Sequence, residues 1–142
     1  MSSENVEIVR RSVERWSDGD LEGFIENVDP EVEWWTSGLY PGVDPVYNGH
    51  EGFRKFWDDF HEMWQTLTME LHDVVAVGDR VAFAFHFDAT GRDGVRAGRD
   101  QAALATIRNG LLVRIQNYET WDGALEALTT ATTPVRRRTP RR

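Results

Sequence analysis

The chain has 142 residues, of which 40% are hydrophobic and 11% aromatic, so one domain with a sizeable core is expected. The absence of cysteine excludes disulfide bonds and thiolate chemistry, and the absence of an apolar run of about 18 residues excludes a membrane-spanning helix. The formal net charge is −8, and because residues 133–142 contain five arginines and no acid, residues 1–132 alone carry −8 − 5 = −13. A body this acidic repels the phosphates of nucleic acids, so neither a nucleic acid nor a membrane is expected as a partner.

The composition also divides the chain into two parts. We predict a single domain over residues 1–132, followed by a flexible tail rich in arginine and proline over 133–142. The N-terminus lacks the apolar core of a secretion signal, which favours a cytoplasmic protein. Fifteen arginines against the single Lys55 indicate a GC-rich bacterial host.

The first third of the chain is predicted to contain two helices and one strand. The first helix is indicated by four apolar residues at spacings of three and four, namely Val6, Val9, Val13 and Trp16. Asp20 is suited to cap a second short helix, which Asp29 and Pro30 end. Alternation predicts a strand over residues 31–36, and the segment after it is rich in glycine and proline, as is typical of a loop.

A third helix is predicted over residues 50–67 because its apolar residues form one wide face. Those residues are Phe53, Phe56, Trp57, Phe60, Trp64 and Leu67. The apolar period then changes to two, which predicts strands over residues 68–77, 80–90, 95–108 and 111–120. The pair Asn109-Gly110 is a strong hairpin signal, and Gly98 suggests a bulge in the third of these strands. A short helix is predicted over 122–131.

This order of elements, α-α-β-α-β-β-β-β, predicts an α+β fold. The last four strands form a meander, so the sheet is expected to be antiparallel with helices gathered on one face. A strongly curved antiparallel sheet packed against three helices makes a cone, and the inside of a cone is where ligand sites form.

Three motifs, taken in order, resemble the nuclear transport factor 2-like superfamily, whose fold is cystatin-like. They are WSDGDLEGF at residues 16–24, YNGHEGFRKFW at 47–57 and RNGLLVRIQNYETWDGALEAL at 108–128. More narrowly, the chain resembles the SnoaL-like proteins, which are relatives of polyketide cyclases and ketosteroid isomerase. The resemblance covers about residues 4 to 130 and implies the fold, but no particular reaction.

The resemblance also implies which isomerase residues are missing. Ketosteroid isomerases carry a tyrosine donor where this chain has Ser12, a base aspartate where it has Trp35, and a protonated aspartate where it has Ala103. Cyclases of the SnoaL type also use an aspartate near the place of Ala103. Neither mechanism is therefore supported, and Trp35 suggests a pocket that stacks a flat or apolar ligand.

Epoxide hydrolases of the same fold provide another comparison. By this resemblance, His86 and Asp88 stand where these hydrolases have an arginine and an aspartate. Asn117, which precedes Tyr118, stands where they have a second aspartate. These positions are expected to line the pocket. His86 is the candidate general base and Asp88 the residue that orients it, because a histidine beside a carboxylate can have a pKa near neutrality.

The alternation of strand residues separates two faces of the strand over 80–90. We expect Ala82, Ala84, His86 and Asp88 to line the cone. The other face carries Phe83, Phe85 and Phe87, which we expect on the outside of the sheet, where a homodimer would cover them. The remaining expected ligand contacts are Trp35, Tyr40, Tyr47, Trp57, Gln101, Ala103, Asn117 and Glu119.

Two functions remain open. The first is an acid/base enzyme of cyclase, isomerase or hydrolase type that acts on a small apolar cyclic substrate through His86 and Asp88. The second is a non-catalytic module that binds a ligand or a partner, with the His–Asp pair only satisfying polarity at the end of the sheet. Neither function requires a cofactor, and a metal is not expected because the sequence supplies no third ligand beside His86 and Asp88.

Overall fold

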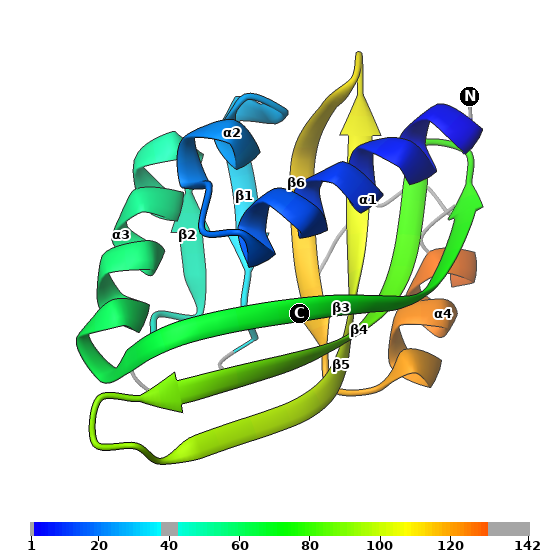
Figure 1. Cartoon of the computed structure of the whole chain (residues 1–142). Coiled ribbons are helices and arrows are strands. Elements are labelled where there is room, and N and C mark those ends of the chain that lie inside the picture. Colours follow the sequence, from blue (N-terminus) through cyan, green and yellow to red (C-terminus); the bar gives the residue numbers. More distant parts are fainter. Residues whose placement is uncertain (1, 38–42, 131–142) are drawn as a thin grey trace.

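A computed structural model of the chain, shown in Figure 1, describes residues 2–37 and 43–130. Its elements are α1 (Ser2–Ser17), α2 (Leu21–Ile25), β1 (Val28–Trp35), β2 (Val46–Asn48), α3 (Gly49–Met63), β3 (Trp64–Val77), β4 (Arg80–Gly91), β5 (Arg96–Arg108), β6 (Leu111–Tyr118) and α4 (Trp121–Thr130). The predicted α+β order is confirmed, with the short strand β2 added. The third helix is shorter than predicted, because residues 64–67 belong to β3.

Two parts of the predictions lie outside the described residues, namely Tyr40 and the tail over 133–142. The division into a domain over 1–132 and a tail therefore stays a prediction. Within the described residues, no helix combines the length and the hydropathy needed to cross a membrane.

Local sequence explains where the helices begin and end. Gly19 has a φ of 79°, a left-handed conformation that favours glycine, and it follows the end of α1. The backbone N–H of Gly23 donates to Asp20 Oδ1 at 2.9 Å, so Asp20 caps α2 as predicted. Gly49 opens α3 with a φ of 72°, and a Cβ there would lie 3.0 Å from the carbonyl oxygen of Pro30.

The six strands form one curved sheet in the order β2-β1-β6-β5-β4-β3. The pairs β3–β4, β4–β5, β5–β6 and β1–β2 are antiparallel, which confirms the predicted meander. The pair β1–β6 is parallel, so the prediction of a purely antiparallel sheet is wrong. The first strand thus enters the sheet beside the last one.

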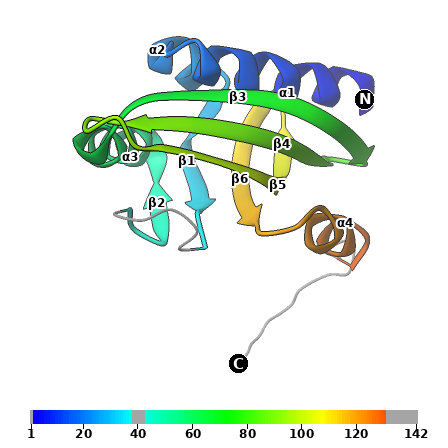
Figure 2. The same cartoon turned by 60° about the horizontal axis from the view of Figure 1, so that its bottom comes forward.

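The helices cover both faces of the sheet (Figure 2). We call the face toward α1 and α3 the inner face, and the face that carries α4 the outer face. The first three helices lie on the inner side, as predicted for the cone. On the outer face, α4 packs Ala124 and Leu128 against Ala82, Ala102 and Leu104. The small side chains allow the helix to approach the strands closely.

The predicted orientation of β4 is wrong. Phe83, Phe85 and Phe87 belong to the main core on the inner face, whereas His86 and Asp88 lie on the outer face. The reason is the size of the two spaces. The inner side, where α1 and α3 arch over the sheet, accommodates phenylalanine rings, while the outer side beneath α4 accommodates alanine.

The predicted bulge at Gly98 is also wrong, because β4 and β5 pair in one unbroken register. Gly98 has a steric role instead. A Cβ at this position would lie 2.7 Å from Asp88 Oδ1 and 3.3 Å from His86 Nε2. Glycine therefore leaves the outer face open for these two side chains.

Candidate functional site

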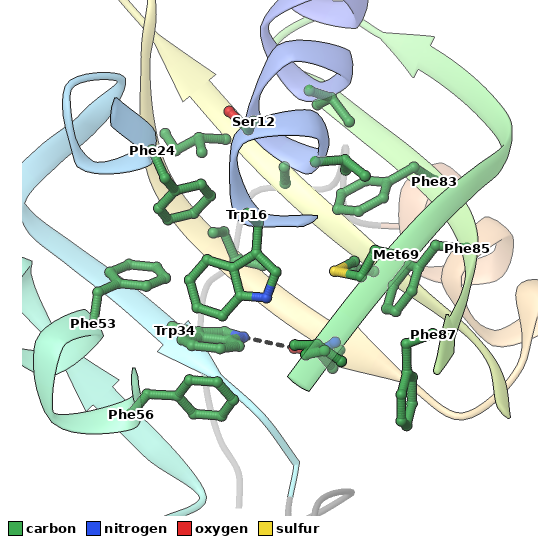
Figure 3. Close-up of a pocket in the computed structure, with 18 of the residues that line it drawn as sticks. Ser12, Trp16, Phe24, Trp34, Phe53, Phe56, Met69, Phe83, Phe85 and Phe87 are labelled. Atoms are coloured by element: carbon green, nitrogen blue, oxygen red, sulfur yellow. Dashed lines mark hydrogen bonds between the residues drawn. The ribbon is translucent and has the colours of Figure 1, made fainter. Parts of the chain in front are cut away.

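A hollow lies between the inner face of the sheet and the helices α1, α2 and α3 (Figure 3). Nineteen residues line it: Val9, Ser12, Val13, Trp16, Phe24, Trp34, Phe53, Phe56, Phe60, Leu67, Met69, Phe83, Phe85, Phe87, Ala103, Ala105, Leu112, Ile115 and Asn117. The centre of a water-sized sphere can occupy about 80 Å³ of this space. One water needs roughly 10–15 Å³ on this measure, so the hollow has room for several waters or one ring compound.

Aromatic rings form one side of the hollow. Trp34 and Phe53 stack with their centroids 4.9 Å apart and their planes 13° apart. Trp16 meets Trp34 edge to face at 5.8 Å, and Phe56 lies 4.4 Å from Trp34. Figure 3 shows these rings gathered from α1, β1 and α3. The rings fix one another, so this side of the hollow is rigid and suited to contact a flat apolar surface.

Few polar atoms reach the hollow. The indole N–H of Trp34 donates to Asn117 Oδ1 at 2.6 Å. The hydroxyl of Ser12 on α1 is buried and has no hydrogen-bond partner. Among the nineteen lining residues there is no aspartate, glutamate, histidine, lysine, arginine or tyrosine. The described wall therefore offers no side chain that titrates near neutral pH.

Two predicted ligand contacts lie in the wall. Ala103 on β5 and Asn117 on β6 are cross-strand partners and both face the hollow. Gln101 lies on the same face, opposite Phe85, and is 3% exposed, but it does not line the hollow. Whether Ala103 and Asn117 contact a ligand stays a prediction.

The other described residues of the predicted set lie away from the hollow. Trp35 is on the outer face, where the Arg114 guanidinium lies 5.3 Å from its ring centroid. Trp57 packs against Trp16 outside the wall, and Glu119 is exposed beyond the end of β6. These three positions were expected to line the cone, and the structure does not bring them there.

Tyr47 is buried but serves the loop before β2 rather than the hollow. Its hydroxyl donates to Asp59 Oδ2 at 2.8 Å and accepts from the backbone N–H of Asp44 at 2.8 Å. Burial, with the neighbouring carboxylate of Asp59, raises the pKa of Tyr47 to about 12. Lys55 also contacts Asp59, at 2.8 Å, so this network ties α3 to the loop.

His86 and Asp88 form a polar cluster on the outer face. Nδ1 of His86 donates to Asp100 Oδ1 at 2.7 Å, and its Nε2 lies 3.4 Å from Asp88 Oδ1. On the neighbouring strand β3, His72 Nε2 lies 3.3 Å from Glu70, and the rings of His72 and His86 are 6.4 Å apart. The described residues hold no group of three or more side chains arranged to bind a metal. A catalytic role in the hollow has no geometric basis for His86 or Asp88.

We predict that the imidazole of His86 titrates above its ordinary value of 6.5, because the hydrogen bond to Asp100, and then that to Asp88, raise its pKa. The protonated ring therefore stabilises the fold fully below pH 6.5, and this contribution is lost as the pH rises through the folded-state pKa. An NMR titration of the ring C–H signals should show that Asp100→Asn lowers the midpoint more than Asp88→Asn does. Equal midpoints in all three proteins would contradict this geometry.

Sequence reasoning missed two residues of the wall that carry its chemistry. Trp34, not Trp35, faces the hollow, and alternation contains the signal because Val32 and Trp34 share one side of β1. Ser12 was considered only as the place of a missing tyrosine. No sequence pattern marks an unpartnered hydroxyl, since that property depends on the packing around it.

The sequence matches one known family of protein domains. The model of the SnoaL-like domain matches the sequence over residues 9–115. The chain belongs to the SnoaL-like domain family. The predicted resemblance is confirmed.

Solved structures agree with the family. TerC, co-crystallised with polyporic acid, superposes with a TM-score of 0.75 at 25% identity over 89% of this chain and 98% of TerC. A nuclear transport factor 2-like protein of unknown function from Burkholderia pseudomallei gives 0.73 at 19% identity, over 89% and 98% of the two chains. A SnoaL-like polyketide cyclase candidate from Jannaschia sp. CCS1 gives 0.69 at 17%, over 90% and 93%. The last two show the fold alone. No curated protein matches the sequence.

Proposed function

We propose that this SnoaL-like domain binds one small, apolar, ring-containing molecule in the hollow, and that it does so without acid/base catalysis by the described wall. The observation that carries the proposal is the composition of the wall, which is aromatic and aliphatic except for Ser12 and Asn117. Sites for small molecules are concave, mostly apolar and have a few placed polar groups. The hollow meets each of these criteria.

The choice between the two functions left open by the sequence rests on proton transfer. A general acid or base must lie within hydrogen-bond reach of the proton that it moves. His86 and Asp88 are separated from the hollow by the sheet itself, because they lie on its outer face. The non-catalytic binding module is therefore favoured over the acid/base enzyme.

The relatives support small-molecule binding. TerC was crystallised with polyporic acid, a small organic molecule. A charged ligand would lose its hydration without compensation in this hollow, because no lining residue carries a charge, which favours an uncharged molecule. The room of about 80 Å³ favours a compact ring compound over an extended chain.

Enlarging one wall residue is expected to abolish most of the binding. We choose Ala103→Leu, because Ala103 is 1% exposed and its Cβ points into the hollow from β5. The added carbons occupy part of the ligand space, so the affinity for a ring probe such as 2-naphthol should fall at least about ten-fold. Titration of the protein by NMR or calorimetry measures the dissociation constant.

Ala84→Leu is the matched control for this experiment. Ala84 lies on the neighbouring strand β4, faces the outer side of the sheet and is partly exposed, so a leucine there leaves the hollow unchanged. Its affinity for 2-naphthol should equal that of the original protein. If Ala103→Leu binds the probe as well as Ala84→Leu does, the ligand does not occupy the hollow.

The homodimer expected from the sequence stays a prediction. It was argued from a phenylalanine row on the outer face of β4, and this row faces inward instead. The phenylalanine row lies in the hollow, so it does not require a second subunit to cover it. The exposed large apolar side chains on the outer face are Trp35, Val75 and Val77. Light scattering of the protein in solution measures its mass directly and decides between monomer and dimer.

A further inference from the structure

One atom in the wall is unexplained by the fold. Ser12 lies in the middle of α1, is 5% exposed and lines the hollow, and its Oγ has no hydrogen-bond partner. The great majority of buried polar side-chain atoms in proteins are hydrogen-bonded, so an exception needs a cause. Because Ser12 is a residue of the wall, a molecule that fills the hollow is the candidate partner for this hydroxyl.

The helix itself does not supply this partner. A serine inside a helix commonly donates to the carbonyl one turn earlier, but Ser12 Oγ makes no such bond. Alanine has a higher helix propensity and would bury no polar atom. A serine at this position therefore lowers the stability of the empty protein relative to alanine.

The other unpartnered buried atoms do not share this setting. They belong to Arg80 Nε and to the amide of Gln101, and neither residue lines the hollow. Asn117 in the wall already accepts from the Trp34 indole. Within the part of the chain that the structure describes, Ser12 is the wall residue whose hydroxyl is left for a ligand.

We propose that Ser12 is the specificity-determining residue of the hollow, and that it selects uncharged ring compounds with a hydroxyl or carbonyl oxygen on one edge. This inference rests on the proposed function and adds the chemical class of the ligand. A serine hydroxyl both donates and accepts, so it pairs with a phenol or a ketone. The described wall carries no cation to offset a carboxylate, which excludes acids in their charged form.

Two probes of equal size test this selection. 2-Naphthol carries a hydroxyl where 2-methylnaphthalene carries a methyl group, and the rings are the same. The quantity measured is the ratio of their dissociation constants, obtained by NMR titration of each protein. For Ser12→Ala we expect this ratio to shift by about three- to ten-fold against 2-naphthol, which is the range that one net hydrogen bond supplies. The affinity for 2-methylnaphthalene should stay equal or rise.

Two variants control for effects on α1. Ser17→Ala removes a hydroxyl on the same helix that accepts from the backbone N–H of Met69 at 2.9 Å and does not line the hollow, so the ratio should not change. Ser12→Thr keeps the hydroxyl, and the ratio should stay near that of the original protein. If Ser12 had a purely structural role, Ser12→Ala would change stability without moving the ratio.

The outcomes separate this inference from the proposed function. If both probes bind and the ratio is the same for the original protein and Ser12→Ala, the hollow binds rings but Ser12 does not select among them, and the hydroxyl serves an ordered water. If neither probe binds the original protein, the proposed function fails, and the ligand class fails with it. A shift of the ratio that occurs in Ser12→Ala but not in Ser17→Ala or Ser12→Thr supports both the proposed function and the selection by Ser12.

Discussion

Replacing Trp16 by alanine is expected to lower the free energy of unfolding by about 3–5 kcal/mol. Trp16 is 6% exposed and joins α1 to α2, α3 and β1. Five aromatic rings have their centroids within 6.1 Å of its ring, namely Phe24, Trp57, Phe56, Trp34 and Phe53. Truncation removes the burial of the indole and leaves a cavity beside the hollow, and the surrounding rings can collapse into it only partly.

Chemical denaturation followed by far-ultraviolet circular dichroism measures this loss. Trp35→Ala is the matched control, because it removes the same side chain from the adjacent part of the same fold. Trp35 is 37% exposed and contacts Arg114 on the outer face, so its removal should lower the free energy of unfolding by about 1 kcal/mol or less. Equal losses for the two variants would show that Trp16 is not at the centre of the core.

Replacing Asn117 by leucine is expected to lower the free energy of unfolding by about 2 kcal/mol. The two side chains have the same number of heavy atoms and the same branching at Cγ, so the change acts mainly through polarity. Asn117 Oδ1 accepts the indole N–H of Trp34 at 2.6 Å, and both residues are buried. With leucine in place of asparagine, the indole N–H stays buried without an acceptor, and this unmet hydrogen bond outweighs the gain in apolar surface.

A double-mutant cycle isolates this hydrogen bond. Trp34→Phe removes the donor and keeps an aromatic ring in the wall. In that background, Asn117→Leu should cost at least about 1 kcal/mol less than it does in the original protein. If the two substitutions add without coupling, the hydrogen bond between β1 and β6 contributes no stability of its own.

The fold was predictable from the sequence because its signals are local. The apolar spacing of residues 6–16 and 53–60 gives α1 and α3, and Asp20, Gly78 and Asn109-Gly110 mark the cap and two of the turns. The parallel pair β1–β6 and the short strand β2 were not predictable in the same way. They depend on which segments meet after long stretches of chain, and no local pattern encodes that.

The hairpin of β4 and β5 shows that the residues expected in the hollow could not all lie on one face. In an antiparallel pair, residues opposite each other share a face, and the turn after Gly91 sets Phe83 opposite Ala103 and His86 opposite Asp100. Ala103 and His86 therefore cannot both face the hollow, although both were expected there. Alternation separates two faces and the pairing with β5 shows which residues share a face, but only the packing of α1, α3 and α4 decides which face is inner.

The remaining error concerns what fills each space. A histidine and an aspartate two residues apart suggested an active site, yet on an open sheet face such a pair binds a neighbouring carboxylate and stays half exposed. Ala82 and Ala84 suggested room for a ligand, yet both lie on the outer face, and Ala82 makes room for α4. Small residues indicate close approach, and the sequence does not say whether a helix or a ligand approaches.

The parallel contact between β1 and β6 has a consequence for how the protein is made. On the ribosome, α1, α2, β1, β2 and α3 emerge first, and β1 has no partner in the meander until β6 (Leu111–Tyr118) has been synthesised. Within the described sheet, β1 pairs with the meander only at β6, so native assembly waits for the last strand. Nascent chains that stop before residue 111 therefore lack the strand that joins Trp34 and its neighbouring rings to the meander, and their hollow is incomplete on the side that β6 supplies.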